Sequence, residues 1–383
     1  MKNNRTFLEK LLDGAEVQYE KLSDVLPIKR GKRVVRNELD ENGIYPVYQN
    51  SLQPLGYFNN KNCEAYTTFI IAAGAAGEIG FSEVEFWAAD DCYYFECPKE
   101  VLNNKFLYYV LMAQKHNLLK KVRKASIPRL GKDTIEKLSI PIPPLPIQTE
   151  IVKILDALTA LTSELTSELT LRRKQYEYYR EKLLSFDSLE LLNMGGAKKK
   201  LIDVAYFQNG KGHEKNIDEN GSFIVINSKF ISTNGAVKKY CNDQLVPLFK
   251  EDILIVMSDL PNGKALAKTF FVTEDNKYTL NQRIGRITVK EGRELLPSFV
   301  NHFLNRNKQL TKYDNGTDQT NLRKDQILDV IIPIPPLEQQ HRIVSILDKF
   351  ETLTNSITEG LPLAIEQSQK RYEYYRELLL NFS

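Results

Sequence analysis

Hydrophobic residues follow a helical rhythm over two long stretches of the chain. Apolar positions between residues 151 and 183 mostly fall three or four apart, which places them on one face of an α-helix. No Gly or Pro interrupts residues 147–186, so the pattern predicts a rod of about 55 Å at roughly 1.5 Å per residue. A similar stretch follows residue 338 but contains Gly360 and Pro362, where we expect a kink or a short break.

The segments outside these stretches combine strand and helix patterns. β-Branched and aromatic residues predict strands in YPVYQNS, AYTTFIIAA, DCYYFEC, SFIVINSK and DILIVMS. Helical spacing is present in KFLYYVLMAQKHNLLKKV and LPSFVNHFLNRNKQLTKY. The sequence therefore predicts an α+β protein with mixed globular segments.

The chain also repeats itself. IPIPPL occurs at Ile140–Leu145 and again at Ile332–Leu337, an offset of 192 residues, and Q..IV.ILD recurs behind each copy. The blocks RKQYEYYREKLLSF and KRYEYYRELLLNF follow at an offset of 196, while KLSDV/KLIDV and two copies of DENG carry the repeat into the globular segments. Adjacent prolines disfavour helix, so each IPIPP is predicted to be an extended hinge. The repeating unit is a globular segment, a proline hinge and a long helix.

The two predicted rods need partners for their apolar stripes. The simplest solution is an antiparallel coiled coil within one chain, with the globular segments at opposite ends. The tyrosines near the rod ends either complete this seam or bind a further helical partner, because Tyr178 and Tyr374 lie off the stripe. The candidate interface comprises Tyr176, Tyr178, Tyr179, Tyr372, Tyr374 and Tyr375.

The first rod contains a short tandem, TSELTSEL, whose copies end at Leu165 and Leu169. One added copy would lengthen a helix by about 6 Å and rotate its end about 40° past a full turn. The tandem is therefore either a spacer that sets the distance between the rod ends or ordinary helix filler.

Composition narrows the class of protein only in part. A chain of 383 residues predicts two or more domains. Its four cysteines lack CxxC spacing and are expected to be reduced thiols. The start of the chain is charged and amphipathic, and no apolar run reaches 18 residues, so we expect a cytoplasmic protein.

Basic residues are concentrated locally although the net charge is only +3. Residues 115–132 hold seven Lys or Arg and residues 28–37 hold five, without an acid in either range. Each globular segment also ends in a polar loop, KASIPRLGKD or NGTDQTNLRKD. Such side chains bind phosphates and base edges, although an ordinary solvated surface would explain them too. The candidate DNA-binding residues are Lys29, Arg30, Lys32, Arg33, Lys120, Lys121, Arg123, Lys124, Ser126, Arg129, Lys132, Lys211, Lys215, Lys238, Lys239, Thr317, Gln319, Asn321, Arg323 and Lys324.

No catalytic or metal-binding residues are predicted. The chain lacks GxxxxGK[ST], and the glycine-rich FIIAAGAAGEIG lacks the order of a nucleotide-binding fold, so we interpret it as tight turns or close backbone packing. The four histidines, His116, His213, His302 and His341, have no metal-ligand spacing, and surface or core roles are expected for them.

The duplicated IPIPPL…Q..IV.ILD…YEYYRE block resembles the two conserved regions of specificity (S) subunits of type I restriction-modification systems, and TSELTSEL resembles the tandem of the central region. The resemblance covers the whole chain. It implies two target-recognition domains related by a pseudo-twofold axis and a bipartite double-stranded DNA target. It also implies two modification (M) subunits with S-adenosylmethionine and adenine-N6 chemistry, and restriction (R) subunits with ATP and Mg. The second rod departs from the pattern because it lacks the tandem and contains Gly360 and Pro362.

We therefore predict a DNA-recognition and scaffold subunit without catalysis or a cofactor of its own. Its predicted parts are recognition domain 1 (1–145), a central helix (146–187), recognition domain 2 (188–337, with a linker at 188–199) and a C-terminal helix (338–383) kinked near 360–362. One alternative is a self-contained methyltransferase or nuclease, but an NPPY-type or DPPY-type motif is absent. A second alternative is a coiled-coil adaptor that binds only protein.

Overall fold

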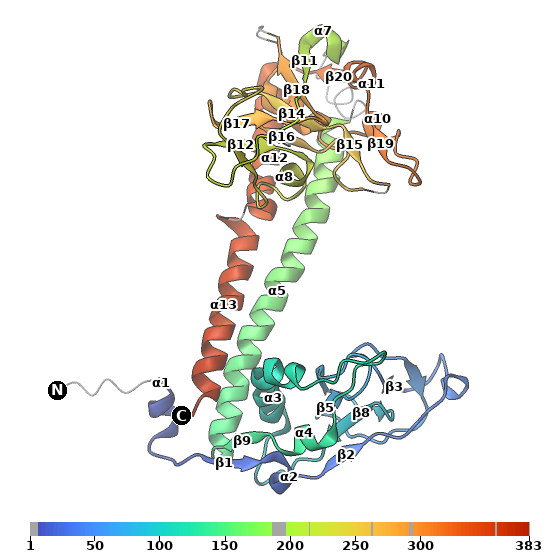
Figure 1. Cartoon of the computed structure of the whole chain (residues 1–383), viewed down its shortest axis with the longest axis vertical. Coiled ribbons are helices and arrows are strands. Elements are labelled where there is room, and N and C mark those ends of the chain that lie inside the picture. Colours follow the sequence, from blue (N-terminus) through green and yellow to red (C-terminus); the bar gives the residue numbers. More distant parts are fainter. Residues whose placement is uncertain are drawn as a thin grey trace, which may run out of the picture. The chain divides into compact units, whose positions relative to one another are not determined.

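The computed structural model describes residues 7–185, 197–213, 215–261, 263–290, 294–356 and 358–382. The chain divides into two compact units. Unit 1 consists of Met1–Leu165 with Ile365–Ser383, and unit 2 consists of Thr166–Ala364. Many of their elements are labelled in Figure 1.

Unit 1 is built around two small sheets. A four-stranded antiparallel sheet has the order β2-β8-β5-β6, and a three-stranded sheet has the order β4-β3-β7, in which β3 and β7 are parallel. Strands β1 and β9 form an antiparallel pair. The strands are β1 (Gln18–Lys21), β2 (Ile28–Arg30), β3 (Tyr45–Tyr48), β4 (Gly56–Phe58), β5 (Thr67–Ile71), β6 (Ile79–Ser82), β7 (Trp87–Ala88), β8 (Cys92–Phe95) and β9 (Ser139–Ile142). The helices are α1 (Phe7–Leu12), α2 (Leu22–Val25), the 3₁₀ helix η1 (Arg36–Glu38), α3 (Asn104–Lys120) and α4 (Lys132–Glu136).

Unit 2 repeats this topology strand for strand. Its four-stranded sheet has the order β11-β18-β14-β16, its three-stranded sheet the order β13-β12-β17, and β10 pairs with β20. A short pair, β15-β19, is added. The strands are β10 (Ala197–Lys200), β11 (Ala205–Asn209), β12 (Phe223–Ile226), β13 (Tyr240–Cys241), β14 (Ile253–Val256), β15 (Ser258–Asp259), β16 (Thr269–Phe271), β17 (Tyr278–Leu280), β18 (Ile284–Val289), β19 (Thr320–Asn321) and β20 (Ile331–Ile334). The shorter helices are α7 (Leu201–Val204), α8 (Ser228–Ser232), α9 (Pro297–Leu304), α10 (Lys308–Thr311) and α11 (Lys324–Leu328).

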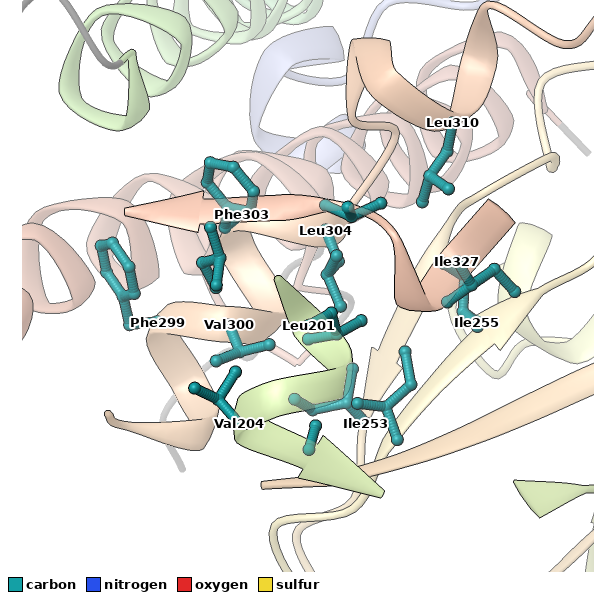
Figure 2. Close-up of a cluster of buried hydrophobic side chains, with 14 of the residues drawn as sticks. Leu201, Val204, Ile253, Ile255, Phe299, Val300, Phe303, Leu304, Leu310 and Ile327 are labelled. Atoms are coloured by element: carbon teal, nitrogen blue, oxygen red, sulfur yellow. The ribbon is translucent and has the colours of Figure 1, made fainter. Parts of the chain in front are cut away.

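The predicted strands agree with the structure because their apolar runs are buried on both faces. All five residues of β5 and all four of β14 are buried, as expected for central strands covered on each side. Figure 2 shows the resulting core of unit 2, where Ile253 and Ile255 of β14 lie with Phe299 and Phe303 of α9. The α+β prediction and the internal repeat are thereby confirmed.

The proline hinges are extended, as predicted, and they are also paired. Each one is the last strand of its unit, β9 or β20, and each is bonded to the first strand, β1 or β10. In both units the globular part therefore ends in an antiparallel pair of its first and last strands, immediately before the long helix.

A buried glutamine then fixes the start of each long helix. Gln148 is fully buried, and its amide donates to the carbonyls of Val101 and Pro143 while its oxygen accepts from the Asn103 N–H. The repeat places Gln340 in an identical network in unit 2, with Glu294, Leu296 and Pro335. In each unit these bonds connect the proline hinge, the first turn of the long helix and the loop before α3 or α9. We call this junction the hinge corner.

Two long helical regions follow the hinges. Helix α5 spans Leu145–Leu184 without a break, as predicted. The second region consists of α12 (Leu337–Asn355) and α13 (Gly360–Leu380). The interruption thus comes a few residues before the predicted kink, and Pro362 lies in the first turn of α13, where its missing N–H is tolerated.

Halves of these helices pair antiparallel within each unit. In unit 1, Thr162 of α5 bonds to Ser368 of α13 at 2.8 Å, while Leu379 packs in the cluster that contains Ile147. In unit 2, Tyr176 and Tyr179 of α5 contact Phe350 of α12. Each unit is therefore completed by the tyrosine-rich end of the helix that follows the other globular segment.

Two boundary predictions are wrong. The helix predicted from LPSFVNHFLNRNKQLTKY is divided into α9 and α10, because Arg306 adopts a φ of 53° and Asn307 caps the new helix through the Gln309 N–H. The predicted linker 188–199 extends too far, since Ala197 begins β10. Residues 188–196 of that linker and Phe186 of the tyrosine block lie outside the described residues.

Candidate nucleic-acid interface

The basic loop of unit 1 is anchored on the end of a central strand. Arg123 and Arg129 exchange main-chain hydrogen bonds, which closes the loop between them. Leu130 N–H then donates to the Ala72 carbonyl at 2.8 Å, just beyond β5. Lys124, Ser126 and the two arginines are exposed. The loop therefore presents predicted DNA-binding residues on a rigid base.

The polar loop of unit 2 has the same anchor. Leu322 N–H donates to the Met257 carbonyl at 2.7 Å, just beyond β14. Strand β19 pairs with β15, and the Gln319 amide donates to the Ser258 hydroxyl at 2.7 Å. Thr317, Asn321 and Lys324 are exposed.

The two loops place Arg129 and Asn321 at equivalent positions. Arg129 forms an antiparallel bridge with Ala73, and Asn321 forms one with Ser258, in each case one residue before the anchoring leucine. One loop position therefore carries different polar residues in the two copies. Arginine suits the O6 and N7 atoms of guanine, whereas asparagine suits the N6 and N7 atoms of adenine.

A polar cavity lies beside the loop of unit 1. Its volume is about 360 Å³, and its lining includes Arg30, Arg123 and Arg129 together with Asp91 and Tyr93. Arg30 is held there because its Nε donates to the Asp90 carbonyl at 2.8 Å. The structure thus brings the two separate basic stretches of the sequence to one place. A larger cavity of about 790 Å³ in the same unit is lined by both acids and lysines, a mixed charge that gives no preference for phosphate.

The remaining predicted basic residues fall into two groups. Three have ion-pair partners: Lys29 with Glu96, Lys132 with Glu136, and Arg323 with Asp325, at 2.6 to 3.1 Å. Exposed pairs of this kind are weak, but they lower the local positive charge. Among described residues, no ion-pair partner is found for Lys32, Arg33, Lys120, Lys121, Lys211, Lys215, Lys238 or Lys239, which are all exposed.

The six tyrosines of the helix ends differ in how much of each side chain is exposed. Tyr176, Tyr372 and Tyr375 pack against the hydrophobic clusters of their units, and burial raises the pKa of the Tyr176 and Tyr372 hydroxyls. Tyr178 and Tyr374 are instead 60% and 62% exposed, as their position off the stripe predicts. Tyr179 is intermediate, since it is 39% exposed and stacks on Phe350.

One cluster with metal-ligand chemistry was not anticipated. His302 of α9 lies with Asp348 and Glu351 of α12, with their ligand atoms within 4.8 Å of one another. The His302 Nε2 bonds to Asp348 at 2.7 Å, and Arg180 donates to the His302 carbonyl. In unit 1 the equivalent Asp156 accepts from Tyr109 at 2.5 Å. We therefore interpret the position as a helix-to-helix hydrogen bond in both units.

The other residues with reactive side chains have structural surroundings. His213 is buried and bonds to Thr279 at 3.0 Å, while His116 and His341 are exposed. All four cysteines are free, and burial raises the pKa of the Cys63 and Cys97 thiols to about 12, so these two thiols remain protonated at neutral pH.

The sequence profile of the type I restriction modification DNA specificity domain matches residues 15–171 and 195–367. The chain belongs to this family of specificity subunits. Its members are non-catalytic DNA-recognition subunits, and this chain is such a specificity (S) subunit.

Relatives and solved structures agree with this assignment. A putative type I restriction enzyme specificity subunit of Haemophilus influenzae is 42% identical to this S subunit over 100% of both chains. The EcoR124I/EcoR124II specificity subunit of Escherichia coli is 31% identical over 98% of this chain and 97% of its own. The crystal structure of an S subunit from M. genitalium has a TM-score of 0.61 at 16% identity and covers 96% of each chain, which supports the fold alone. No helix among the described residues is long and apolar enough to span a membrane.

Proposed function

We propose that each globular unit of this S subunit binds one half of a gapped bipartite double-stranded DNA target. The observation that carries this proposal is the equivalent position of Arg129 and Asn321. One backbone geometry presents an arginine in one unit and an asparagine in the other, and such a difference suits a protein that reads two unlike half-sites. The cavity beside Arg129 supports the same proposal, because three arginines outnumber the two aspartates, Asp91 and Asp133, in its lining.

The helices are proposed to hold two M subunits, and the complex would recruit R subunits. Tyr178 and Tyr374 are the best candidates for this contact because they are exposed and have equivalent positions in the repeat. Each also forms an edge-on pair with the next tyrosine, at 5.3 and 5.4 Å between ring centroids, and such exposed aromatic pairs are typical of interface anchors. S-adenosylmethionine, ATP and Mg would be bound by the partners.

The docking proposal can be tested by co-purification. Tyr178→Ala and Tyr374→Ala should each weaken retention of a co-expressed M subunit, whereas Tyr206→Ala, which removes a tyrosine that is 65% exposed on β11, should not. Undiminished retention by the double variant would refute the role of these two tyrosines.

The DNA proposal is tested by expressing the S subunit with a type I M subunit from the same genome and mapping N6-methyladenine. One gapped bipartite motif is expected, and insertion of a TSEL unit after Leu169 should lengthen its gap while both half-sites stay the same. A complex that forms without methylating any motif would refute DNA reading. Strongly salt-dependent DNA binding would exclude the protein-only adaptor, because phosphate contacts release counterions.

A further inference from the structure

The same end of the four-stranded sheet carries a row of residues in each unit. In unit 1 this row begins where the Lys32 N–H donates to the Ala88 carbonyl at 3.0 Å. It continues through the Ala72 N–H, which donates to the Asp91 carbonyl. It ends where Leu130 N–H donates to Ala72, one residue after Arg129. Strands β2, β8 and β5 thus place Lys32, Asp91 and Arg129 along one edge.

Unit 2 contains the same row, bond for bond. Lys211 N–H donates to the Leu280 carbonyl at 3.2 Å, and Met257 N–H donates to the Arg283 carbonyl at 2.9 Å. Leu322 N–H then donates to Met257, one residue after Asn321. The equivalent set in this unit is therefore Lys211, Arg283 and Asn321, and all three side chains are exposed.

The two lysines are held at their positions by the glycine that precedes each of them. A Cβ on Gly31 would lie 2.1 Å from the Ala89 carbonyl oxygen, and one on Gly210 would lie 2.0 Å from that of Asn281. Only glycine permits this approach between the strand end and the neighbouring sheet. The Gly-Lys dipeptide is consequently a built feature of both units, although the residues around it differ.

The row thus contains one constant position and two variable ones. Lysine is retained at the first, whereas Asp91 is replaced by Arg283 and Arg129 by Asn321. In a protein that binds two unlike half-sites, both units contact the same kind of phosphate backbone, but each unit contacts different bases. Phosphate contacts carry no sequence information, whereas base contacts do.

We propose that Lys32 and Lys211 are equivalent phosphate contacts and that the other members of each row read bases. This inference deepens the proposed DNA function and rests on it. The ends of β2, β8 and β5, beside which the row lies, span roughly 10 Å at about 4.8 Å per strand, which is close to the width of a major groove of about 12 Å. One row therefore has the dimensions to contact a phosphate at one side of the groove and base edges within it.

The phosphate assignment predicts a loss of salt dependence. Lys32→Gln and Lys211→Gln should each lower the slope of log K against log salt by about 1. Between about 50 and 200 mM salt, the wild-type complex should then lose about three- to fourfold more affinity than either variant. Both slopes are measured for the S–M complex on a duplex with the mapped motif and on a scrambled duplex. Lys32→Arg and Lys211→Arg should restore the slope, and Lys10→Gln, at an exposed lysine of α1, should leave it unchanged.

The two alternatives to a phosphate role give different results. Slopes equal to the wild-type slope on both duplexes would overturn the assignment. A changed methylation motif in Lys32→Gln or Lys211→Gln would also overturn it, because a phosphate contact cannot alter sequence preference. Trp87 fluorescence checks local folding of the Lys32 variant, since the Trp87 Nε1 donates to the Lys32 carbonyl at 2.8 Å.

The variable positions are tested through the methylated motif itself. Arg129→Ala should relax one half-site and Arg283→Ala the other, each with the opposite half-site unchanged. Variants that keep both half-sites would refute base reading by this row. If the wild-type complex methylates no bipartite motif, the proposed function fails, and the lysine slopes on the scrambled duplex still decide the phosphate assignment.

Discussion

The buried glutamine at the start of α5 offers a direct test of how the hinge corner is held. Gln148→Leu keeps nearly the same volume but removes three hydrogen bonds of 2.7 to 2.8 Å. The Asn103 N–H and the carbonyls of Val101 and Pro143 would then lose their side-chain partner in a closely packed corner. Each buried group left unsatisfied costs about 1–3 kcal/mol. With the lower half of that range for the three groups, we expect a loss of about 3–5 kcal/mol in the free energy of unfolding.

The chain contains its own reporter for this experiment. Trp87 is the only tryptophan and lies in β7 of unit 1, so its fluorescence follows the unfolding of that unit in urea. With a slope of about 2 kcal/mol per molar urea, the midpoint should fall by about 1.5–2.5 M. Gln369→Leu, at an exposed position of α13 in the same unit, should shift it by less than about 0.3 M, in line with the small effects of surface substitutions. A Gln148→Leu midpoint within that margin would refute the reasoning, and Gln340→Leu provides the reciprocal test in unit 2.

Two further predictions use the same fluorescence. Leu379 is fully buried in the core of unit 1, so Leu379→Ala should destabilise that unit by about 2–5 kcal/mol. Leu171→Ala, at an exposed leucine, is the control. Equal urea midpoints for the two variants would show that α13 does not complete the core. The Asn42 N–H, with the Asn59 amide, bonds to Asp40 and lowers the pKa of that carboxyl, and Asp218 has the matching bonds in unit 2. Because the folded-state pKa is depressed, this contribution is present above the unfolded value of 3.8 and is lost as pH falls through the folded pKa. Asp40→Asn should therefore lower the midpoint at pH 7 and converge with the wild type in acid; a difference that does not change with pH would contradict this linkage.

The internal repeat could be predicted from the sequence because it is written in local patterns. Prolines at 141 and 143 and their copies at 333 and 335 force extended backbone, and unbroken three-to-four spacing forces helix, whatever the tertiary context. The same residue identities, such as Gln148 and Gln340, recur at a fixed offset because both copies perform the same packing task. The helix boundaries near Arg306 and Gly360 do not follow from such patterns, because each depends on a single backbone conformation with a positive φ.

Only the tertiary structure decided which surfaces these patterns form. The tyrosine-rich end of α5 packs in unit 2 and that of α13 packs in unit 1, a choice that no periodicity within one helix can specify. The rows that contain Lys32 and Lys211 could not be predicted from the sequence either. Main-chain hydrogen bonds form these rows, and such bonds allow the side chains to differ between the two units. The sequence by itself determined the repeated hinges and long helices, because their packing requires the same side chains in both copies. Tertiary structure decided the recognition edge, because backbone geometry there is constant while the side chains vary.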